Sequence, residues 1–215
     1  MTLTERDRLV GVILAGGLSR RMGGGDKGLL SLGTATMLGE VVRRISPQVG
    51  RLVRNGNGEP RRFDRLGLPV VEDTVPDFAG PLAGLLAGLR WAAREAPAAT
   101  HILSVSSDAP FLPADLAERL AAALAADPSA SIALAGSAGE VHFVVGLWPI
   151  AKADDLEAAL LSGERKVRAW AGRHRVAVAE FPLRATPDGS VDPFFNANTP
   201  EDMDLARRLL PLLGP

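Results

Sequence analysis

Short apolar runs recur along the chain, and most of them are followed by polar or glycine-rich residues. Runs of about four to eight apolar residues between turn signals are typical of buried β-strands. We therefore predict strands at residues 9–14, 51–54, 69–72, 101–106, 131–135, 141–148 and 176–181.

Helical patterns lie between most of these strands. In residues 81–96 leucines recur three and four positions apart, and Pro81 suits the first position of a helix. A second helix is predicted for residues 113–127, where leucines stand four apart and Asp127-Pro128 ends the pattern. Strands that alternate with helices over the first ~130 residues predict a parallel sheet with helices on both faces.

The alternation changes near residue 131, where strand-like runs come closer together. The predicted fold class is α/β, a three-layer α/β/α Rossmann-like fold with a mostly parallel central sheet. Because the chain has 215 residues, no internal repeat and no linker, we expect a single domain. The stretches at 55–60 and 186–193 are expected to be surface loops, since both contain turn-forming residues.

Polar and glycine residues follow the first four predicted strands. In an open α/β sheet ligands bind at the carboxyl ends of the strands, so these residues are candidates for a binding site. They include Ala15 and Gly16 after the first strand, Asn55 after the second, Asp73 after the third and Asp108 after the fourth. Asn55 or Asp73 alone would be read as a turn residue, but their shared edge makes them candidate ligand contacts.

The longest of these loops, from Leu14 to Lys27, combines glycines with basic side chains. Glycines let backbone N–H groups approach a phosphate closely, while Arg21 and Lys27 can neutralise its charge. We interpret the loop as a binding loop for a nucleoside triphosphate; the alternative is a solvated glycine-rich connection. It has no Walker A motif, and its G-x-G-x-x-G match at 23–28 lies too far from the strand to be a dinucleotide fingerprint.

Asp108 is the candidate metal ligand, because Mg²⁺ typically takes one or two carboxylates together with substrate phosphates. The alternative role is capping of the helix predicted to start at Pro113. Asp108 stands at the end of a predicted buried strand and lies five residues before Pro113, which favours the metal-binding role.

Composition narrows the class of protein. A formal net charge of −1 does not supply the excess of Lys and Arg that general binding to nucleic acid requires. The lack of Cys excludes disulfides and thiolate metal sites, and favours a cytoplasmic location. We expect neither a signal peptide nor a membrane span, which needs ~18 consecutive apolar residues. The three histidines show no metal-ligand spacing, and no G-x-S-x-G motif indicates a hydrolase.

Several motifs resemble those of the molybdenum cofactor guanylyltransferases, the MobA family, over nearly the whole chain. The family's opening signature, L-A-G-G followed by R-M-G-G-x-D-K-G-L-L, is present at 14–17 and 21–30. The wider nucleotidyltransferase superfamily shares only a looser form of it. The more discriminating motifs are E-D-x, G-P-L-A-G, D-x-P-[YF]-[IL]-P, G-E-R-[RK]-V and N-x-N-T-P-E-[ED], at 72–74, 80–84, 108–113, 163–167 and 196–202.

The resemblance implies a nucleotidyltransferase domain with a nucleotide-binding half at about 8–112 and an acceptor-binding half at about 113–205. The nucleotide contacts that it implies are Leu14, Ala15, Gly16, Lys27, Asn55, Asp73 and Asp108. It makes Lys27, Arg21 and Asp108 catalytic, with Mg²⁺ on Asp108. Asn196 and Asn198 are the expected acceptor contacts.

Three segments depart from the family pattern. Residues 33–37 replace the usual G-[KR]-P-L, the loop 55–59 is unlike that of relatives, and 140–143 stand where relatives carry a polar stretch next to H-P. The role of Asn57 is therefore left open, and His142 is left outside the predicted site.

The implied reaction is attack by the terminal phosphate of molybdopterin on the α-phosphorus of GTP, which yields a guanine dinucleotide cofactor and pyrophosphate. The nucleophile is already an anion, so catalysis requires alignment and charge stabilisation more than a base. One alternative is a related transferase that uses CTP on molybdopterin or on a small phosphate. Another is an inactive nucleotide-binding module. The resemblance suggests a monomer that associates transiently with a molybdenum insertase and other cofactor-pathway proteins.

Overall fold

The computed structural model describes residues 1–15, 28, 30–57, 66–75, 80–187 and 189–213. Its centre is a seven-stranded sheet in the order β5-β4-β1-β6-β8-β7-β9. The strands are β1 (Leu9–Leu14), β4 (Arg51–Asn55), β5 (Val70–Val71), β6 (His101–Ser106), β7 (Ile132–Ser137), β8 (Glu140–Pro149) and β9 (Val176–Phe181). All seven predicted strands are confirmed, with bounds that differ by at most two residues.

The sheet is parallel apart from one strand. Strand β8 runs antiparallel to both of its neighbours, β6 and β7, and every other pair in the sheet is parallel. The carboxyl ends of β1, β4, β5, β6, β7 and β9 therefore meet at one edge of the sheet, together with the start of β8. We call this edge the catalytic edge, because the sequence predicts the site residues to follow these strands.

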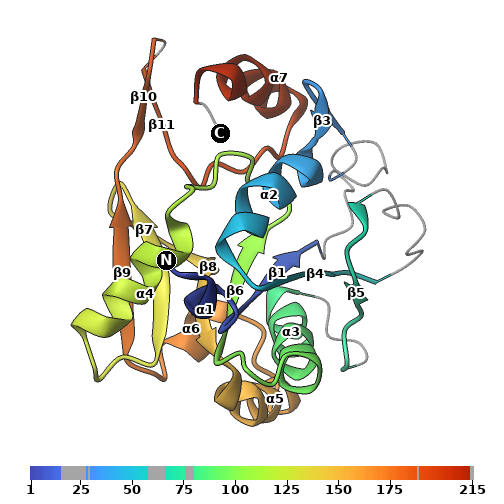
Figure 1. Ribbon diagram of the computed structural model, residues 1–215, viewed down its shortest axis with the longest axis vertical. Coiled ribbons are helices and arrows are strands. Elements are labelled where there is room, and N and C mark those ends of the chain that lie inside the picture. Colours follow the sequence, from blue (N-terminus) through green and yellow to red (C-terminus); the bar gives the residue numbers. More distant parts are fainter. Residues whose placement is uncertain (16–27, 29, 58–65, 76–79, 188, 214–215) are drawn as a thin grey trace.

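Helices cover both faces of the sheet, so the predicted three-layer α/β/α architecture is confirmed (Figure 1). Side chains of β1 alternate between the faces: Val10 and Val12 pack in one core cluster, while Leu9 and Ile13 pack in the other. The first cluster includes α3 (Pro81–Glu95), α5 (Ala153–Leu161) and α6 (Val167–Ala171). The second includes α2 (Met37–Ile45) and α4 (Leu116–Ala126).

A third apolar cluster lies beyond the catalytic edge, where Figure 1 shows α7 above the tip of β6. It joins Met203 of α7 (Pro200–Leu209) to Leu32 of β2 and Phe111 of the loop after β6. The remaining elements are the strands β2 (Ser31–Leu32), β3 (Ala35–Thr36), β10 (Arg184–Thr186) and β11 (Gly189–Val191), with α1 (Leu3–Arg6) and the 3-10 turns η3 (Ser46–Gln48), η5 (Ile150–Lys152) and η6 (Leu210–Leu212).

Two expectations about local structure were wrong. Helix α4 begins at Leu116 and not at Pro113, because side chains of α2 and η3 take the carbonyl oxygens of Leu112 and Pro113 as hydrogen-bond acceptors. Residues 186–193 include half of the β10–β11 hairpin, in which Arg184 pairs with Val191, and are not only a loop. The strands of this hairpin are too short for the periodicity of their side chains to be visible in the sequence.

The described helices include none that is both long enough and apolar enough to cross a membrane.

Candidate active site

The first candidate residues are brought together by the register of the parallel strands. Leu14 lies opposite Asn55 of β4 on one side and opposite Ser106 of β6 on the other. Ala15 N donates to Asn55 O at 3.1 Å, and Ser107 N donates to Leu14 O at 3.2 Å. The loop that continues from Ala15 therefore leaves the sheet between Asn55 and the Ser106–Asp108 turn.

Three further predicted residues, Gly16, Arg21 and Lys27, lie outside the described residues. Their roles in phosphate binding stay predictions. The structure shows that their loop starts after Ala15, between Asn55 and the turn after β6.

Asn55 and Asp73 form a hydrogen-bonded pair on the β4 and β5 side of this loop. The Asn55 amide donates to Asp73 Oδ1 at 2.9 Å and to Val71 O at 3.0 Å. Asn57 donates to Asp73 Oδ2 at 2.8 Å and accepts from Asp73 N at 3.0 Å. Asn57, whose role the sequence left open, thus belongs to this cluster, and the Asp73 carboxylate is oriented by two side-chain amides.

The start of α3 is shaped to fit against Asn55. Gly80 has φ +146°, a conformation that favours glycine, and Pro81 follows at the first helical position. At Gly84 a Cβ would lie 2.3 Å from Asn55 Oδ1 and 2.9 Å from Leu14 Cδ2. Only glycine lets the helix approach the Asn55 side chain this closely.

Asp108 lies on the other side of β1, half-buried in the turn after β6. Ser106 donates its hydroxyl hydrogen to Asp108 Oδ1, and Oδ2 forms no hydrogen bond with the described residues. The residue before α4 is Asp115, so Asp108 does not cap that helix. Within the described chain no group of three His, Asp or Glu side chains could hold a metal. A single carboxylate that shares Mg²⁺ with substrate phosphates fits this arrangement.

A buried polar network holds the loop that carries Asp108. Arg44 Nη1 donates to Leu112 O at 3.2 Å, and Gln48 Nε2 donates to Pro113 O at 2.9 Å. The Gln48 side-chain oxygen accepts from Ala117 N at 2.9 Å. Arg44 is in turn paired with buried Glu40 at 2.7 Å. Helix α2 and η3 thus fix both ends of the segment between Asp108 and α4.

The expected acceptor residues lie beside Asp108. Ala197 N donates to Asp108 O at 3.0 Å, which places the neighbouring residues, Asn196 and Asn198, at the catalytic edge with exposed side chains. The ring of Phe195 stacks on that of Phe111, with the centroids 5.8 Å apart.

A second polar cluster lies at the ends of β7 and β8. Ser137 Oγ donates to Asp192 Oδ2 at 2.7 Å and lies 2.6 Å from His142 Nε2. The imidazole packs against the Phe194 ring, with the centroids 4.6 Å apart. Burial lowers the pKa of His142 below its ordinary value, although Asp192, Glu140 and Glu180 act to raise it. This cluster was not predicted, because its members come from three separate segments.

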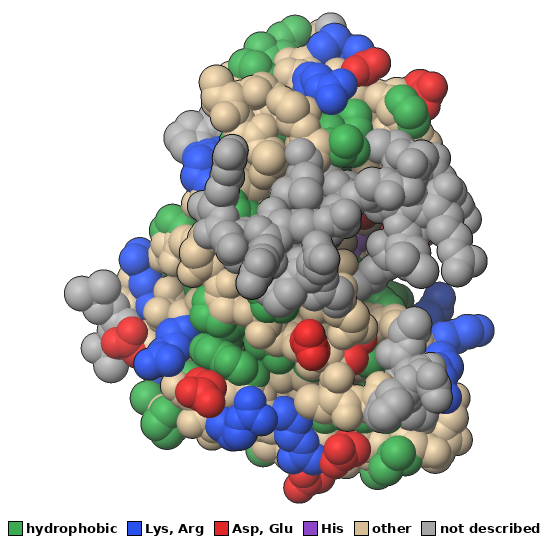
Figure 2. All heavy atoms as spheres, turned by 90° about the vertical axis from the view of Figure 1, so that its right-hand side faces the viewer, with side chains coloured by type: hydrophobic (Ala, Val, Ile, Leu, Met, Phe, Trp, Pro, Cys, Tyr) green, Lys and Arg blue, Asp and Glu red, His purple; other side chains and the backbone are tan. Residues whose placement is uncertain are grey.

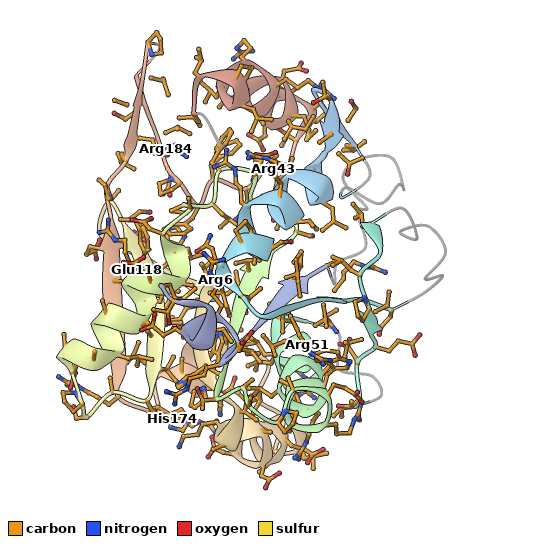
Figure 3. The ribbon with its side chains drawn as sticks, viewed as in Figure 1. Arg6, Arg43, Arg51, Glu118, His174 and Arg184 are labelled. Carbon is orange, nitrogen blue, oxygen red and sulfur yellow. The ribbon has the colours of Figure 1, made fainter. Side chains whose placement is uncertain are left out.

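The other histidines lie outside the catalytic edge. His101 begins β6, as expected. His174 Nε2 lies 3.0 Å from Asp155 Oδ2 and its ring meets Trp170 edge-on. Figure 3 shows His174 at the end of the molecule opposite α7.

Charged side chains of both signs are interspersed on the face shown in Figure 2, over the part of it that the structure describes. Proteins that track a nucleic-acid backbone instead gather Lys and Arg in a stripe.

Comparison with known proteins identifies the family to which this chain belongs. The MobA-like NTP transferase domain family matches residues 11–178. The molybdenum cofactor guanylyltransferase of Bradyrhizobium sp. (strain ORS 278) is 49% identical over 210 residues, which cover 97% of this chain and 96% of the relative. The chain belongs to the molybdenum cofactor guanylyltransferase family.

Solved structures support the fold. Molybdopterin-guanine dinucleotide biosynthesis protein A from Archaeoglobus fulgidus superposes with a TM-score of 0.69 at 22% identity, covering 95% of this chain and 99% of the other. Rv0371C from Mycobacterium tuberculosis, in complex with manganese, gives a TM-score of 0.63 at 21% identity and covers 94% and 98% of the two chains. At these identities the likeness concerns the fold alone.

Three motifs of this MobA-like chain have clear structural roles. G-P-L-A-G starts α3 and makes room for Asn55. In N-x-N-T-P-E-D, Thr199 and Asp202 form a capping box at the start of α7. In G-E-R-K-V, the Glu164 carboxylate accepts hydrogen bonds from Arg165 N and Lys166 N just before α6. The last two motifs therefore position backbone, and Asn196 and Asn198 are among their exposed polar side chains.

Proposed function

We propose that this nucleotidyltransferase transfers GMP from GTP to the terminal phosphate of molybdopterin, forming molybdopterin guanine dinucleotide and pyrophosphate. The observation that carries the proposal is the strand register. It sets the Asn55–Asp73 cluster and Asp108 on opposite sides of the loop that begins at Leu14. A ligand that spans both sides would place one end at the Asn55–Asp73 cluster and the other at Asp108. A nucleoside triphosphate has a base for the first end and metal-binding phosphates for the second.

The proposed nucleotide contacts are Leu14, Ala15, Gly16, Lys27, Asn55, Asp73 and Asp108. Asn55 uses both amide hydrogens within the protein and its buried Oδ1 packs against Gly84, so it orients the half-exposed Asp73 carboxylate, whose remaining lone pairs are the acceptors of this cluster. Guanine presents two adjacent donor groups, N1–H and N2–H₂, whereas the same edge of each other common base has a single donor group, and guanine therefore suits a carboxylate acceptor best. This acceptor character supports GTP as the substrate.

The chemical step is attack by a phosphate oxygen of molybdopterin on the α-phosphorus, with cleavage of the bond between the α-phosphorus and the bridging oxygen. The pyrophosphate leaves with the electron pair, and no general base is needed because the nucleophile is ionised. The side chains that we propose to stabilise the phosphate oxygens are Lys27 and Arg21. Mg²⁺ on Asp108 would supply further positive charge there.

The acceptor is proposed to bind in the half from 113 to 205, with Asn196 and Asn198 near its phosphate. Support comes from the hydrogen bond between Ala197 N and the backbone carbonyl oxygen of Asp108, which joins this segment to the residue proposed to bind the metal. We expect the active protein to be a monomer that binds a molybdenum insertase transiently. Size-exclusion chromatography with light scattering measures the oligomeric state.

The test is pyrophosphate release with Mg²⁺ and each of the four nucleoside triphosphates, with and without molybdopterin. We expect release with GTP only, and only when molybdopterin is present. Release with CTP would favour a CTP-dependent transferase, and no release with any triphosphate would favour a nucleotide-binding module without activity. Replacing Mg²⁺ with Mn²⁺ or EDTA in the same assay tests the choice of metal.

A further inference from the structure

The Ser137–His142–Asp192 cluster lies where the sheet is irregular. Strand β7 pairs Leu134 with Gly146 but pairs the next residue, Ala135, with His142, so the pairing skips residues 143–145 of β8. Ser104 bridges this irregularity: its hydroxyl donates to Val144 O and accepts from Trp148 Nε1, both at 2.7 Å. The skip separates the start of β8 from β6 and leaves His142 at the catalytic edge.

Proton counting defines which atoms of the cluster are available. An ionised Asp192 can only accept, so the single hydroxyl hydrogen of Ser137 goes to Asp192. Ser137 must then accept from His142 Nε2–H, and a neutral imidazole carries its lone pair on Nδ1. His142 Nδ1 has no hydrogen bond to the described residues, and the side chains of His142 and Asp192 are 20% and 32% exposed. Asp192 Oδ1 also accepts from Phe194 N at 2.7 Å, so the remaining acceptor lone pairs are those of His142 Nδ1 and of the Asp192 carboxylate, both on partly exposed side chains.

The position of the cluster relative to Asp108 follows from the strand pairing. Ser104 of β6, Gly146 of β8 and Leu134 of β7 lie on one line across the sheet. Asp108 comes four residues after Ser104, and Ser137 comes three residues after Leu134. The two sites are therefore about two strand spacings apart, roughly 10 Å. The residues between Asp192 and Ala197 connect them along the chain.

The charges around the cluster select the kind of ligand. Asp192, Glu140 and Glu180 all act on His142 as negative charges, so a phosphate would be repelled. A flat heterocycle with N–H donors on one edge suits these acceptors. The Phe194 ring packs against the His142 ring and helps to fix its position. The catalytic edge thus has two acceptor clusters, Asn55–Asp73 on one side of Asp108 and Ser137–His142–Asp192 on the other.

We propose that the Ser137–His142–Asp192 cluster binds the 2-amino-oxopyrimidine edge of the acceptor's pterin, with His142 Nδ1 and Asp192 accepting hydrogen bonds from its N–H groups. This inference rests on the proposed function. Guanine has the same donor edge, so the chemistry alone fits both rings. The pterin is favoured because the segment that carries Asn196 and Asn198 continues directly from Asp192 and Phe194 of the cluster, whereas the Asn55–Asp73 cluster lies across β6.

The first experiment measures the KM of each substrate in three variants. His142→Gln keeps an amide N–H that can reach Ser137 but moves the acceptor away from the Nδ1 position to an amide oxygen, and Asp192→Asn removes the carboxylate charge. Each should raise the KM for molybdopterin about tenfold, the effect of one lost hydrogen bond that involves a charged or well-oriented partner. The KM for GTP should stay within about twofold in the same variants. His174→Gln is the matched control, since His174 also contacts a carboxylate and an aromatic ring but lies at the opposite end.

A second measurement needs no variant. Free pterin should inhibit the wild-type enzyme competitively against molybdopterin and not against GTP. Competition with GTP, or a raised KM for GTP in His142→Gln, would assign the cluster to guanine and overturn the proposal. An unchanged KM for molybdopterin in both variants would also overturn it.

Direct binding separates this inference from the proposed function. If the wild-type protein releases no pyrophosphate from GTP and molybdopterin, the proposed function fails. Pterin binding, followed by the fluorescence of pterin itself, still tests the cluster. Weaker binding to His142→Gln than to wild type and to His174→Gln supports the site, and equal binding to all three excludes it.

Discussion

The two sides of the catalytic edge are built in different ways. On the proposed nucleotide side, Asn55, Leu14 and Ser106 lie next to one another because β4, β1 and β6 pair in parallel without interruption. On the proposed acceptor side the ladder between β7 and β8 skips residues, and hydrogen bonds between side chains from three segments hold the cluster of Ser137, His142 and Asp192. Backbone register places the first set of groups, and side-chain chemistry places the second.

Asp108 is positioned both by backbone pairing and by side-chain hydrogen bonds. Its strand, β6, belongs to the regular part of the sheet, whereas its loop is held by Arg44 and Gln48 and by the backbone of Ala197. Substitutions on each side should therefore separate loss of stability from loss of activity.

The largest expected effect is on the network that holds the Asp108 loop. Glu40→Leu leaves the guanidinium of Arg44 buried without its carboxylate partner at 2.7 Å. Breaking a buried ion pair in this way costs about 3–5 kcal/mol of the free energy of unfolding, measured by urea denaturation. Arg43→Met is the control, because Arg43 is about half exposed and a surface pair contributes about 0–1 kcal/mol. Equal losses in the two variants would contradict the role of the buried pair.

Glu40 should also make the stability of the fold depend on pH. Burial alone would raise the pKa of Glu40, but hydrogen bonds from Arg43 and Arg44 outweigh it, and the pKa lies below its ordinary value of 4.5. A carboxylate with a lowered folded-state pKa stabilises the fold above its unfolded pKa, and that stability is lost as the pH falls through the folded pKa. Wild-type stability should therefore decline below pH 4.5 more steeply than that of Glu40→Leu.

Asp108→Asn should have the largest effect on catalysis. The amide retains the shape and can still accept from Ser106, but it removes the negative charge proposed to hold Mg²⁺. We expect kcat to fall about 10²- to 10³-fold with little change in stability, as when one preorganised charge-stabilising group is lost. Asp115→Asn, in an exposed position before α4, should retain full activity. Turnover within about threefold of wild type would remove Asp108 from the metal site.

The contrast between the two sides also explains what the sequence could predict. Apolar runs and the polar residues after them locate β1, β4 and β6, and parallel pairing then brings Leu14, Asn55 and Asp108 to one edge. The Ser137–His142–Asp192 cluster could not be predicted in the same way, since it depends on a skipped register between β7 and β8. Periodicity does not encode such a skip.

Gly84→Ala tests the nucleotide side with a smaller change. The new Cβ would lie 2.3 Å from Asn55 Oδ1 and should push the Asn55 amide away from Asp73. Overpacking of this kind costs about 1–3 kcal/mol of stability, and here it should also raise the KM for GTP. Gly88→Ala, one turn later in α3, meets Val12 Cγ2 at 2.7 Å and should lose similar stability without a change in KM. A raised KM in both variants would mean that α3 acts through general packing only.

The smallest effect is expected at the start of α7. Thr199→Ala removes the hydroxyl that accepts from Asp202 N at 3.1 Å, and loss of an N-cap costs about 1 kcal/mol, which a thermal melt detects. The Asp202 carboxylate would still accept from Asn198 N and Thr199 N, at 2.8 and 2.9 Å, so the KM for molybdopterin should not change. Asp202→Ala releases both of those backbone groups, and should raise that KM because Asn198 is then no longer held beside Asp108. If Thr199→Ala alone raised the KM, the acceptor side would depend on the helix as a whole and not on the hydrogen bonds of this one carboxylate.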